Sequence, residues 1–135
     1  MVQIVIDGEP KGKGRPRMST KTGRAYTPKD TASYENWVKL CYQEQARGIY
    51  LEDKPLRARM DCYYMIPKSD SKKKQREKLE GKIRPTKKPD LDNVAKIILD
   101  SLNSIAYKDD SQVVELEINK YYAESARVEI LLSEV

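Results

Sequence analysis

Five aspartates follow directly after the most basic run of the chain. They are Asp90, Asp92, Asp100, Asp109 and Asp110. Asp90 and Asp92 are separated by one residue, and Lys96 stands four residues beyond Asp92. Carboxylates at this density repel one another unless a cation lies between them, and carboxylate oxygens are the ligands that Mg²⁺ and Mn²⁺ prefer. The spacing is therefore typical of a site for a hard divalent cation.

The same residues also have a purely structural interpretation. Asp90 and Asp92 stand where a helix is predicted to begin, and aspartates stabilise the positive end of a helix dipole. Asp92, Lys96 and Asp100 are spaced four residues apart, as in surface ion pairs that contribute about 0.3–0.5 kcal/mol each. The last two aspartates fit a polar turn before a strand. Both interpretations stay open on the residues alone.

The catalytic interpretation treats Asp90, Asp92 and Asp110 as one site. Two aspartates at the start of a helix and a third at the start of the next strand converge if that strand returns beside the beginning of the helix. Mg²⁺ keeps several waters and completes its coordination with substrate phosphate oxygens, so a bare carboxylate cluster suffices. Lys96, on the same face, would stabilise charge developing on a phosphoryl oxygen or leaving group. The chemistry is metal-assisted phosphodiester hydrolysis, with a metal-activated water as the nucleophile.

The chain contains no histidine, which excludes a Ser-His-Asp triad, a Cys-His pair and a histidine general base. Its two cysteines, Cys41 and Cys62, are too few for a zinc site built from sulfur alone, and we expect buried free thiols. Residues 7–11, DGEPK, faintly resemble a restriction-type nuclease motif. That motif is disfavoured because its acidic residues are too close together and Pro10 interrupts the strand it needs.

Positive charge is concentrated in two blocks of the chain. Residues 11–24 carry six basic residues and no acidic one, and residues 68–88 carry ten basic and three acidic residues. Because the net charge of the whole chain is +5, the remainder is acidic. Neither block has an apolar helical face, so this asymmetry favours nucleic acid over a membrane as the polyanionic partner.

Hydrophobic periodicity predicts seven elements. They are a strand at 2–6, a helix from a Thr27-Pro28 cap to about 47, a strand at 56–66, a short basic helix within 69–81, a helix from 91 to about 106, and strands at 112–123 and 126–132. The order β-α-β-α-α-β-β predicts one α/β domain over residues 1–135, α+β-like, with a mixed or mostly antiparallel sheet covered by helices.

The segment KPDLDNVAKIILDSLNSIAYKDDSQV closely resembles the signature of the RusA family of Holliday-junction resolvases, which is common in bacteria and prophages. The matching features are D-x-D-N-x-x-K, a D-x-L-N-like segment and a D-D-x-Q ending. The N-terminal PKGKGRPRMSTKTGRAYTPKDTASYE also resembles the family's K-x-R-P-R … Y-T-P opening. Together the resemblance covers the first 35 residues and residues 85–120.

The resemblance implies that Asp90, Asp92 and Asp110 are catalytic metal ligands and that Lys96 is an essential lysine. It implies Mg²⁺, or alternatively Mn²⁺, as the cofactor. It also implies a homodimer that cuts two opposed strands of a four-way DNA junction symmetrically, and a two-fold dimer matches the symmetry of such a junction. The predicted function is thus a structure-selective endonuclease of DNA recombination and repair.

On this interpretation, the two basic blocks contact DNA phosphates. The predicted contacts are Lys11, Lys13, Arg15, Arg17, Lys21 and Arg24 in the first block and Lys72, Lys73, Lys74 and Arg76 in the second. Asn93, Asp100 and Asp109 are predicted to support the catalytic residues. Ser104 departs from the family pattern, since many relatives have glycine there, and this difference could alter the end of the helix.

Two other functions fit the composition. A non-catalytic basic nucleic-acid-binding module would use the aspartates only as helix caps, and a charged phage-encoded interaction protein would show no salt-dependent DNA binding. No apolar run approaches the roughly 18 residues of a membrane-spanning helix, and the N-terminus lacks the charge order of a secretory signal. We therefore expect a cytoplasmic bacterial or phage-encoded protein with no membrane partner.

Overall fold

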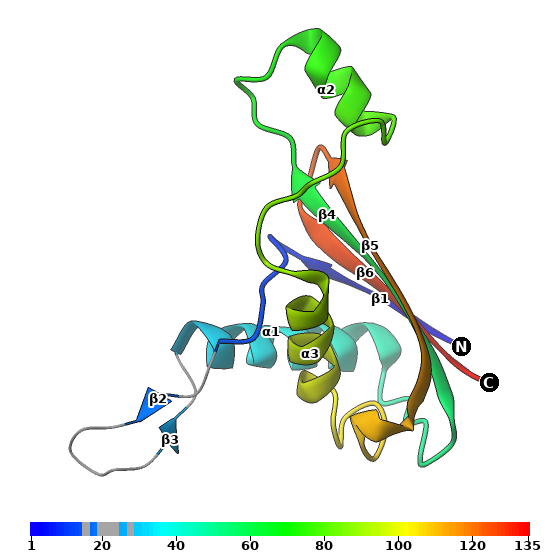
Figure 1. The fold of residues 1–135 in the computed structure, drawn as a ribbon. Coiled ribbons are helices and arrows are strands. Elements are labelled where there is room, and N and C mark those ends of the chain that lie inside the picture. Colours follow the sequence, from blue (N-terminus) through cyan, green and yellow to red (C-terminus); the bar gives the residue numbers. More distant parts are fainter. Residues whose placement is uncertain (15–16, 19–24, 27–28) are drawn as a thin grey trace.

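The computed structural model describes residues 1–14, 17–18, 25–26 and 29–135 (Figure 1). The predicted DNA contacts Arg15, Lys21 and Arg24 and the predicted helix cap at residues 27–28 lie outside the described residues. Arg17 belongs to a described strand, but its side chain is likewise outside the description.

A four-stranded sheet forms the centre of the molecule. Its strands are β1 (Val2–Asp7), β4 (Leu56–Met65), β5 (Val113–Ala123) and β6 (Arg127–Glu134), in the order β1-β6-β4-β5. β6 pairs antiparallel with both β1 and β4, whereas β4 and β5 pair in parallel. The sheet is therefore mixed, as predicted. Two short strands, β2 (Arg17–Met18) and β3 (Ala25–Tyr26), form a separate antiparallel pair within the N-terminal basic segment.

Alternation along the strands creates one apolar face. On β4 the side chains predicted to face inward, from Leu56 to Tyr64, are buried, and Ile4 of β1 and Ile130 of β6 join them. The opposite face of the sheet carries charged side chains, including Arg59, which pairs with Asp61 and Glu117. Both cysteines are buried free thiols, as predicted. The helices therefore need to cover only the apolar face.

Helices α1 (Lys29–Ala46) and α3 (Leu91–Ser101) pack against each other, α1 on β1 and α3 on β5 (Figure 1). On α1 the side chains of Tyr34, Val38, Cys41 and Tyr42, which share one face of the helix, are buried, whereas Trp37 is 41% exposed. The Trp37 indole N–H instead donates to the carbonyl of Asp7 at 3.0 Å, where it ties α1 to the end of β1. No helix in the described part of the chain is both long enough and apolar enough to span a bilayer.

Helix α3 is shorter than the sequence pattern predicts. It ends at Ser101, not near residue 106, and Leu102 is its C-cap. Ser104 has a φ of 65°, a left-handed conformation that glycine adopts more readily than serine. The chain therefore leaves the helix in a tight turn at the position where the family pattern favours glycine. Ala106 and Tyr107 are still buried, because this turn folds back onto the core.

A basic lobe, residues 67–84, extends beyond the end of β4 and β5 (Figure 1). It contains α2 (Lys72–Leu79), which begins with a Ser71 side chain accepting a hydrogen bond from the Lys74 backbone. Lys78 points inward, forms an ion pair with Asp70, and lies 4.5 Å from the centre of the Tyr122 ring. These contacts anchor the lobe to β5.

We expect Asp70→Ala to loosen the basic lobe without unfolding the sheet. The substitution leaves the Lys78 ammonium without its counter-ion, although the Lys78 side chain is only 7% exposed, and an unpaired, largely buried charge is strongly unfavourable. Amide hydrogen exchange across residues 72–79 should become roughly tenfold faster or more. Glu80→Ala, which removes an exposed partner of Lys82, is the control. Equal exchange in the two variants would contradict the anchoring role.

Candidate active site

Helix α3 begins with two exposed carboxylates. Asp90 is its N-cap residue, yet the Asp90 side chain accepts no capping hydrogen bond. Asp92 lies in the first turn, and both Asp92 and Lys96 are exposed. Within the described ranges, none of these three residues forms an ion pair. The Asp90 side chain therefore does not cap the helix, and among the described residues Lys96 does not form the ion pairs with Asp92 and Asp100 that their spacing suggested.

The sheet and the N-terminal loop hold this helix start in place. The Tyr64 hydroxyl of β4 donates to the carbonyl of Pro89 at 3.3 Å. Burial, with the nearby charges of Cys62, Glu9 and Asp90, raises the pKa of Tyr64 to about 12, so the phenol stays a hydrogen-bond donor. A Cβ on Gly12 would stand 2.9 Å from the Cβ of Pro89. Only glycine permits the loop to approach this closely.

A cleft of about 690 Å³ opens at the start of α3. It is lined by Gly12, Lys13, Gly14, Lys88, Pro89, Asp90, Asp92 and Asn93. The cleft combines two exposed carboxylates with an exposed lysine, Lys88, on the rim. Such a surface can hold a divalent cation on one side and a phosphate group on the other.

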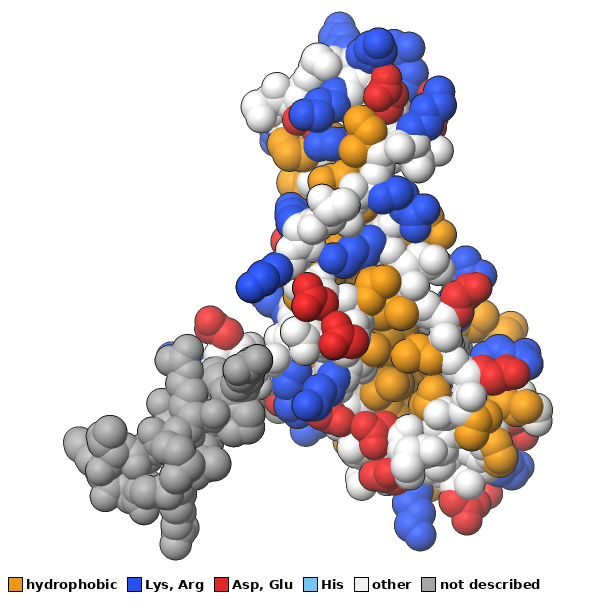
Figure 2. Space-filling view, viewed as in Figure 1, with side chains coloured by type: hydrophobic (Ala, Val, Ile, Leu, Met, Phe, Trp, Pro, Cys, Tyr) orange, Lys and Arg blue, Asp and Glu red, His pale blue; other side chains and the backbone are white. Residues whose placement is uncertain are grey.

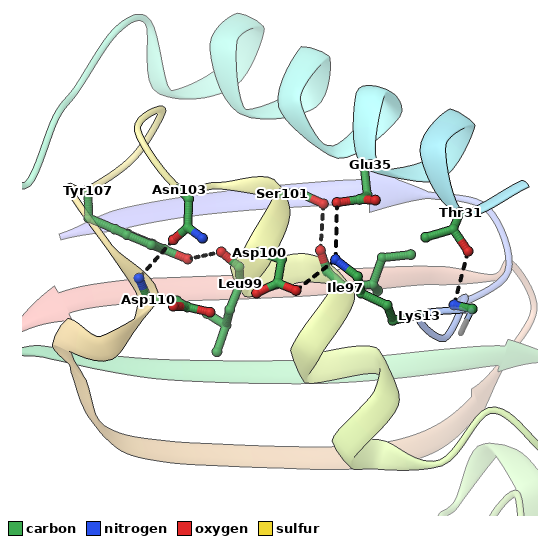
Figure 3. Close-up of polar contacts among 11 residues, drawn as sticks. Lys13, Thr31, Glu35, Ile97, Leu99, Asp100, Ser101, Asn103, Tyr107 and Asp110 are labelled. Atoms are coloured by element: carbon green, nitrogen blue, oxygen red, sulfur yellow. Dashed lines mark hydrogen bonds and ion pairs between the residues drawn. The ribbon is translucent and has the colours of Figure 1, made fainter. Parts of the chain in front are cut away.

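A second acidic group lies at the other end of α3 (Figure 3). The carboxyl groups of Asp100 and Asp110 lie close enough to affect each other's ionisation. The backbone N–H of Asp110 donates to the Asn103 side chain at 2.7 Å. Lys13 donates to Asp100 at 2.8 Å and lies 3.6 Å from Glu35 of α1. This acidic group therefore lies where α3, α1 and the N-terminal loop meet.

The two carboxyl groups of this pair differ in acidity. Burial, the hydrogen bond with Asp100 and the charges of Asp100 and Asp109 raise the pKa of Asp110. Burial also opposes ionisation of Asp100, but hydrogen bonds with Lys13 and Asp110 and the charges of Lys13 and Lys96 lower its pKa. Asp110 is therefore the weaker acid of the pair and Asp100 the stronger.

The structure brings Asp110 to Asp100, not to Asp90 and Asp92. The reason is topological, because β5 begins beside the end of α3 and not beside its start (Figure 1). At 1.5 Å per residue, the helix separates Asp92 from Asp100 by about 12 Å. Across the described residues, no three acidic or cysteine side chains lie close enough to share a metal ion. The assignment of Asp90, Asp92 and Asp110 as ligands stays a prediction.

The predicted supporting residues take different positions. Asn93 lines the cleft, and Asp100 belongs to the second acidic group. Asp109 caps the short 3-10 helix η1 (Asp110–Gln112) and accepts a hydrogen bond from the Ser111 backbone. Hydrogen bonding to the side chain and the backbone of Ser111 lowers the pKa of Asp109. Asp109 thus fixes the turn that carries Asp110.

The predicted DNA contacts that the structure describes differ in how exposed their side chains are. Lys72, Lys73, Lys74 and Arg76 are exposed on α2, and Lys11 is exposed in the N-terminal loop. Figure 2 shows Lys and Arg side chains gathered on the basic lobe. The side chain of Lys13 is only 22% exposed, and its ammonium is bound by carboxylates. Two further residues lie around the site. Lys88, the last residue of the second basic block, lines the cleft, and Glu35 of α1 pairs with Lys13. Lys88 ends a basic run that is visible in the sequence, whereas Glu35 carries no sequence signal.

Comparison with known proteins supplies independent information. The family model described as endodeoxyribonuclease RusA matches residues 7–133. A Bacillus subtilis (strain 168) protein, described as uncharacterized protein YqaN, is 38% identical, and the match covers 99% of this chain and 96% of that relative. The family match includes every residue assigned above to the two acidic groups and to the basic lobe.

Proposed function

Because the chain belongs to the RusA family of Holliday-junction-resolving endodeoxyribonucleases, we propose that it cuts two opposed strands of a four-way DNA junction with the help of Mg²⁺ or Mn²⁺. The observation that carries this proposal is the start of α3. There, Asp90 and Asp92 are exposed, accept no hydrogen bond or ion pair from the described residues, and line a cleft with Lys88.

The carboxylates proposed as ligands suit a hard cation, and two of them, Asp90 and Asp92, line the cleft. Asp90, Asp92 and Asp110 offer only carboxylate oxygens, the ligands that Mg²⁺ takes together with water and substrate phosphates. A bound Mg²⁺ or Mn²⁺ would supply Lewis acidity and make water a nucleophile near neutral pH. Asp90 and Asp92 would hold the ion in the cleft. Asp110 would reach the same ion only if the turn from Leu102 to Gln112 moved toward the start of α3.

The basic residues around the cleft would bind and orient the DNA. Lys88, on the rim, would neutralise a phosphate beside the carboxylates, which would otherwise repel it. Lys96, exposed one turn beyond Asp92, would stabilise the negative charge that develops on the phosphate or on the leaving oxygen. The basic lobe would contact the DNA backbone farther from the cut.

We also propose that two copies act together. A four-way junction presents two equivalent strands related by a two-fold axis, and a C₂ dimer presents two equivalent sites with the same symmetry. A dimer would therefore place one cleft on each strand.

A strand-mapped cleavage assay on a mobile synthetic four-way junction, with and without Mg²⁺, tests the proposal. Paired cuts at symmetric positions on opposed strands, only with the metal present, are the expected result. Junction binding without cleavage under either condition would favour a non-catalytic DNA-binding module. Unpaired cuts, together with a monomer mass by light scattering, would contradict the dimer.

The basic lobe should contribute to DNA binding through Lys73 and Arg76. Both lie on α2 roughly 140–160° around the helix from the inward-facing Lys78, at 100° per residue, so they face away from the anchor. The Lys73→Ala/Arg76→Ala variant should reduce the slope of log Kobs against log salt by up to about 1.8, at roughly 0.9 per phosphate contact. Lys54→Ala, at a lysine paired with Glu134, should leave the slope unchanged. An unchanged slope in the double variant would remove the lobe from the interface.

A further inference from the structure

Lys13 contacts both acidic ends of α3. Its backbone N–H donates to the carbonyl of Asn93, next to Asp92, at 3.3 Å. Its ammonium donates to the Asp100 carboxylate at 2.8 Å. Asn93 and Asp100 are separated by about 10 Å of helix, so Lys13 lies along the helix and joins the cleft to the second acidic group. Figure 3 shows its ammonium between Asp100 and Glu35.

The Lys13 ammonium also acts as a counter-ion inside the protein. It lies between Asp100 of α3 and Glu35 of α1, whose side chains are 25% and 19% exposed. Burial opposes its charge, but hydrogen bonding and attraction to Asp100 and Glu35 raise the pKa of Lys13. A DNA phosphate would have to displace two carboxylates to bind this ammonium, and their separation from it would leave both partly buried and unpaired.

The two glycines beside Lys13 dock the loop backbone. Gly14 donates its N–H to the Thr31 hydroxyl of α1 at 3.0 Å, and Thr31 is only 5% exposed. Gly12 packs so closely on the start of α3 that an added Cβ would be 3.1 Å from the Cβ of Asn93. The segment 12–14 is therefore held to both helices, by its backbone and by the Lys13 side chain.

We propose that Lys13 is a positioning residue and not a phosphate contact. It fixes residues 12–14 against α1 and α3, and so sets where DNA bound by the neighbouring basic residues lies relative to Asp90 and Asp92. This inference rests on the proposed nuclease function. It replaces the DNA-contact role predicted for Lys13 from the sequence, whereas exposed Lys11 keeps that role.

Lys13→Met tests the proposal, because it keeps most of the length of the unbranched side chain and removes the charge. A displacement of about 1 Å at a reacting group can cost around 10² in rate, so we expect kcat to fall roughly 10- to 100-fold. KM and the salt slope of junction binding should stay within error, and Lys13→Arg should restore most of the activity. A salt slope reduced by about 0.9, with kcat unchanged, would instead identify a phosphate contact and overturn the proposal.

Glu35→Gln supplies a second, independent variant. Removing a negative charge from the protein should tighten DNA binding if only overall electrostatics mattered. The positioning role predicts instead a lower kcat, and it predicts that Lys13→Met and Glu35→Gln are not additive, because both break the same contact. Full additivity of the two effects would contradict a shared contact.

NMR-detected amide exchange separates a failure of this inference from a failure of the proposed function. The amides of Lys13 and Gly14 donate to Asn93 and Thr31, and they should exchange faster in Lys13→Met, without any DNA present. Unchanged exchange at these amides would overturn the positioning role. If the parent protein did not cut junctions, the proposed function would fail, while the exchange result would still decide whether Lys13 holds the loop.

Discussion

Asp90→Asn should abolish junction cleavage and leave junction binding intact or tighter. The substitution keeps the shape of the side chain and removes a carboxylate that lines the cleft and accepts no capping hydrogen bond. Losing a preorganised charge-stabilising group costs about 10²–10³ in kcat, and a lost metal ligand should cost at least that much. Binding should improve because one charge that repels phosphate has gone. Single-turnover cleavage and an electrophoretic binding assay measure the two effects.

Two further measurements make this prediction specific. Glu117→Gln removes the same charge from an exposed side chain on the opposite face of the sheet, and it should cleave like the parent. Direct titration with Mn²⁺, followed by electron paramagnetic resonance, should show weaker metal binding for Asp90→Asn than for Glu117→Gln. Loss of junction binding with cleavage retained would refute the assignment of Asp90 to the site.

Lys96→Ala should slow cleavage by roughly 10²–10³-fold while junction binding weakens only slightly. The side chain is exposed one turn beyond Asp92 and, within the described residues, makes no ion pair, so the loss should not come from a broken structural contact. The expected magnitude is that of removing one group that stabilises transition-state charge. Rates at saturating enzyme report the chemical step, and binding at several salt concentrations reports the phosphate contacts.

Comparison with the basic lobe gives this experiment its control. Lys73→Ala removes the same charge from exposed α2 and should weaken binding without changing the rate at saturation. If Lys96→Ala behaved in the same way as Lys73→Ala, with a smaller salt slope and an unchanged rate, Lys96 would be an ordinary DNA contact. That result would favour a non-catalytic DNA-binding module.

Local sequence patterns were sufficient for the seven longer elements and for the sheet face that is buried, but not for the short strands β2 and β3. The alternation along residues 56–66 predicts the inward side chains of β4 correctly, because successive side chains of a strand must point to opposite faces. The apolar face of α3 was predicted for the same kind of reason, from helical spacing. The end of α3 was not, because Ser104 adopts a left-handed conformation that no spacing of apolar residues encodes.

The charged residues that lie together at the start of α3 were also predicted from the sequence. Asp90, Asp92 and Lys96 are close in the chain, so helix geometry alone places them on one exposed stretch. The residue that lies beside Asp110 could not be predicted from the sequence, because it depends on which end of α3 lies beside the start of β5. The parallel pairing of β4 with β5 puts that start beside the end of the helix, and Asp110 therefore meets Asp100.

Lys13 shows most clearly the difference between what the sequence predicts and what the tertiary structure decides. In the sequence it is one of six similar basic residues between positions 11 and 24, and its type and neighbours favour a phosphate contact. In the folded chain its ammonium lies between Asp100 and Glu35, residues 87 and 22 positions away. Residue types and short spacings determined which groups could do the chemistry. Only the packing of α1 against α3 decided which of the charges face solvent and which neutralise one another inside, because Coulomb attraction depends on distance in space and not along the chain.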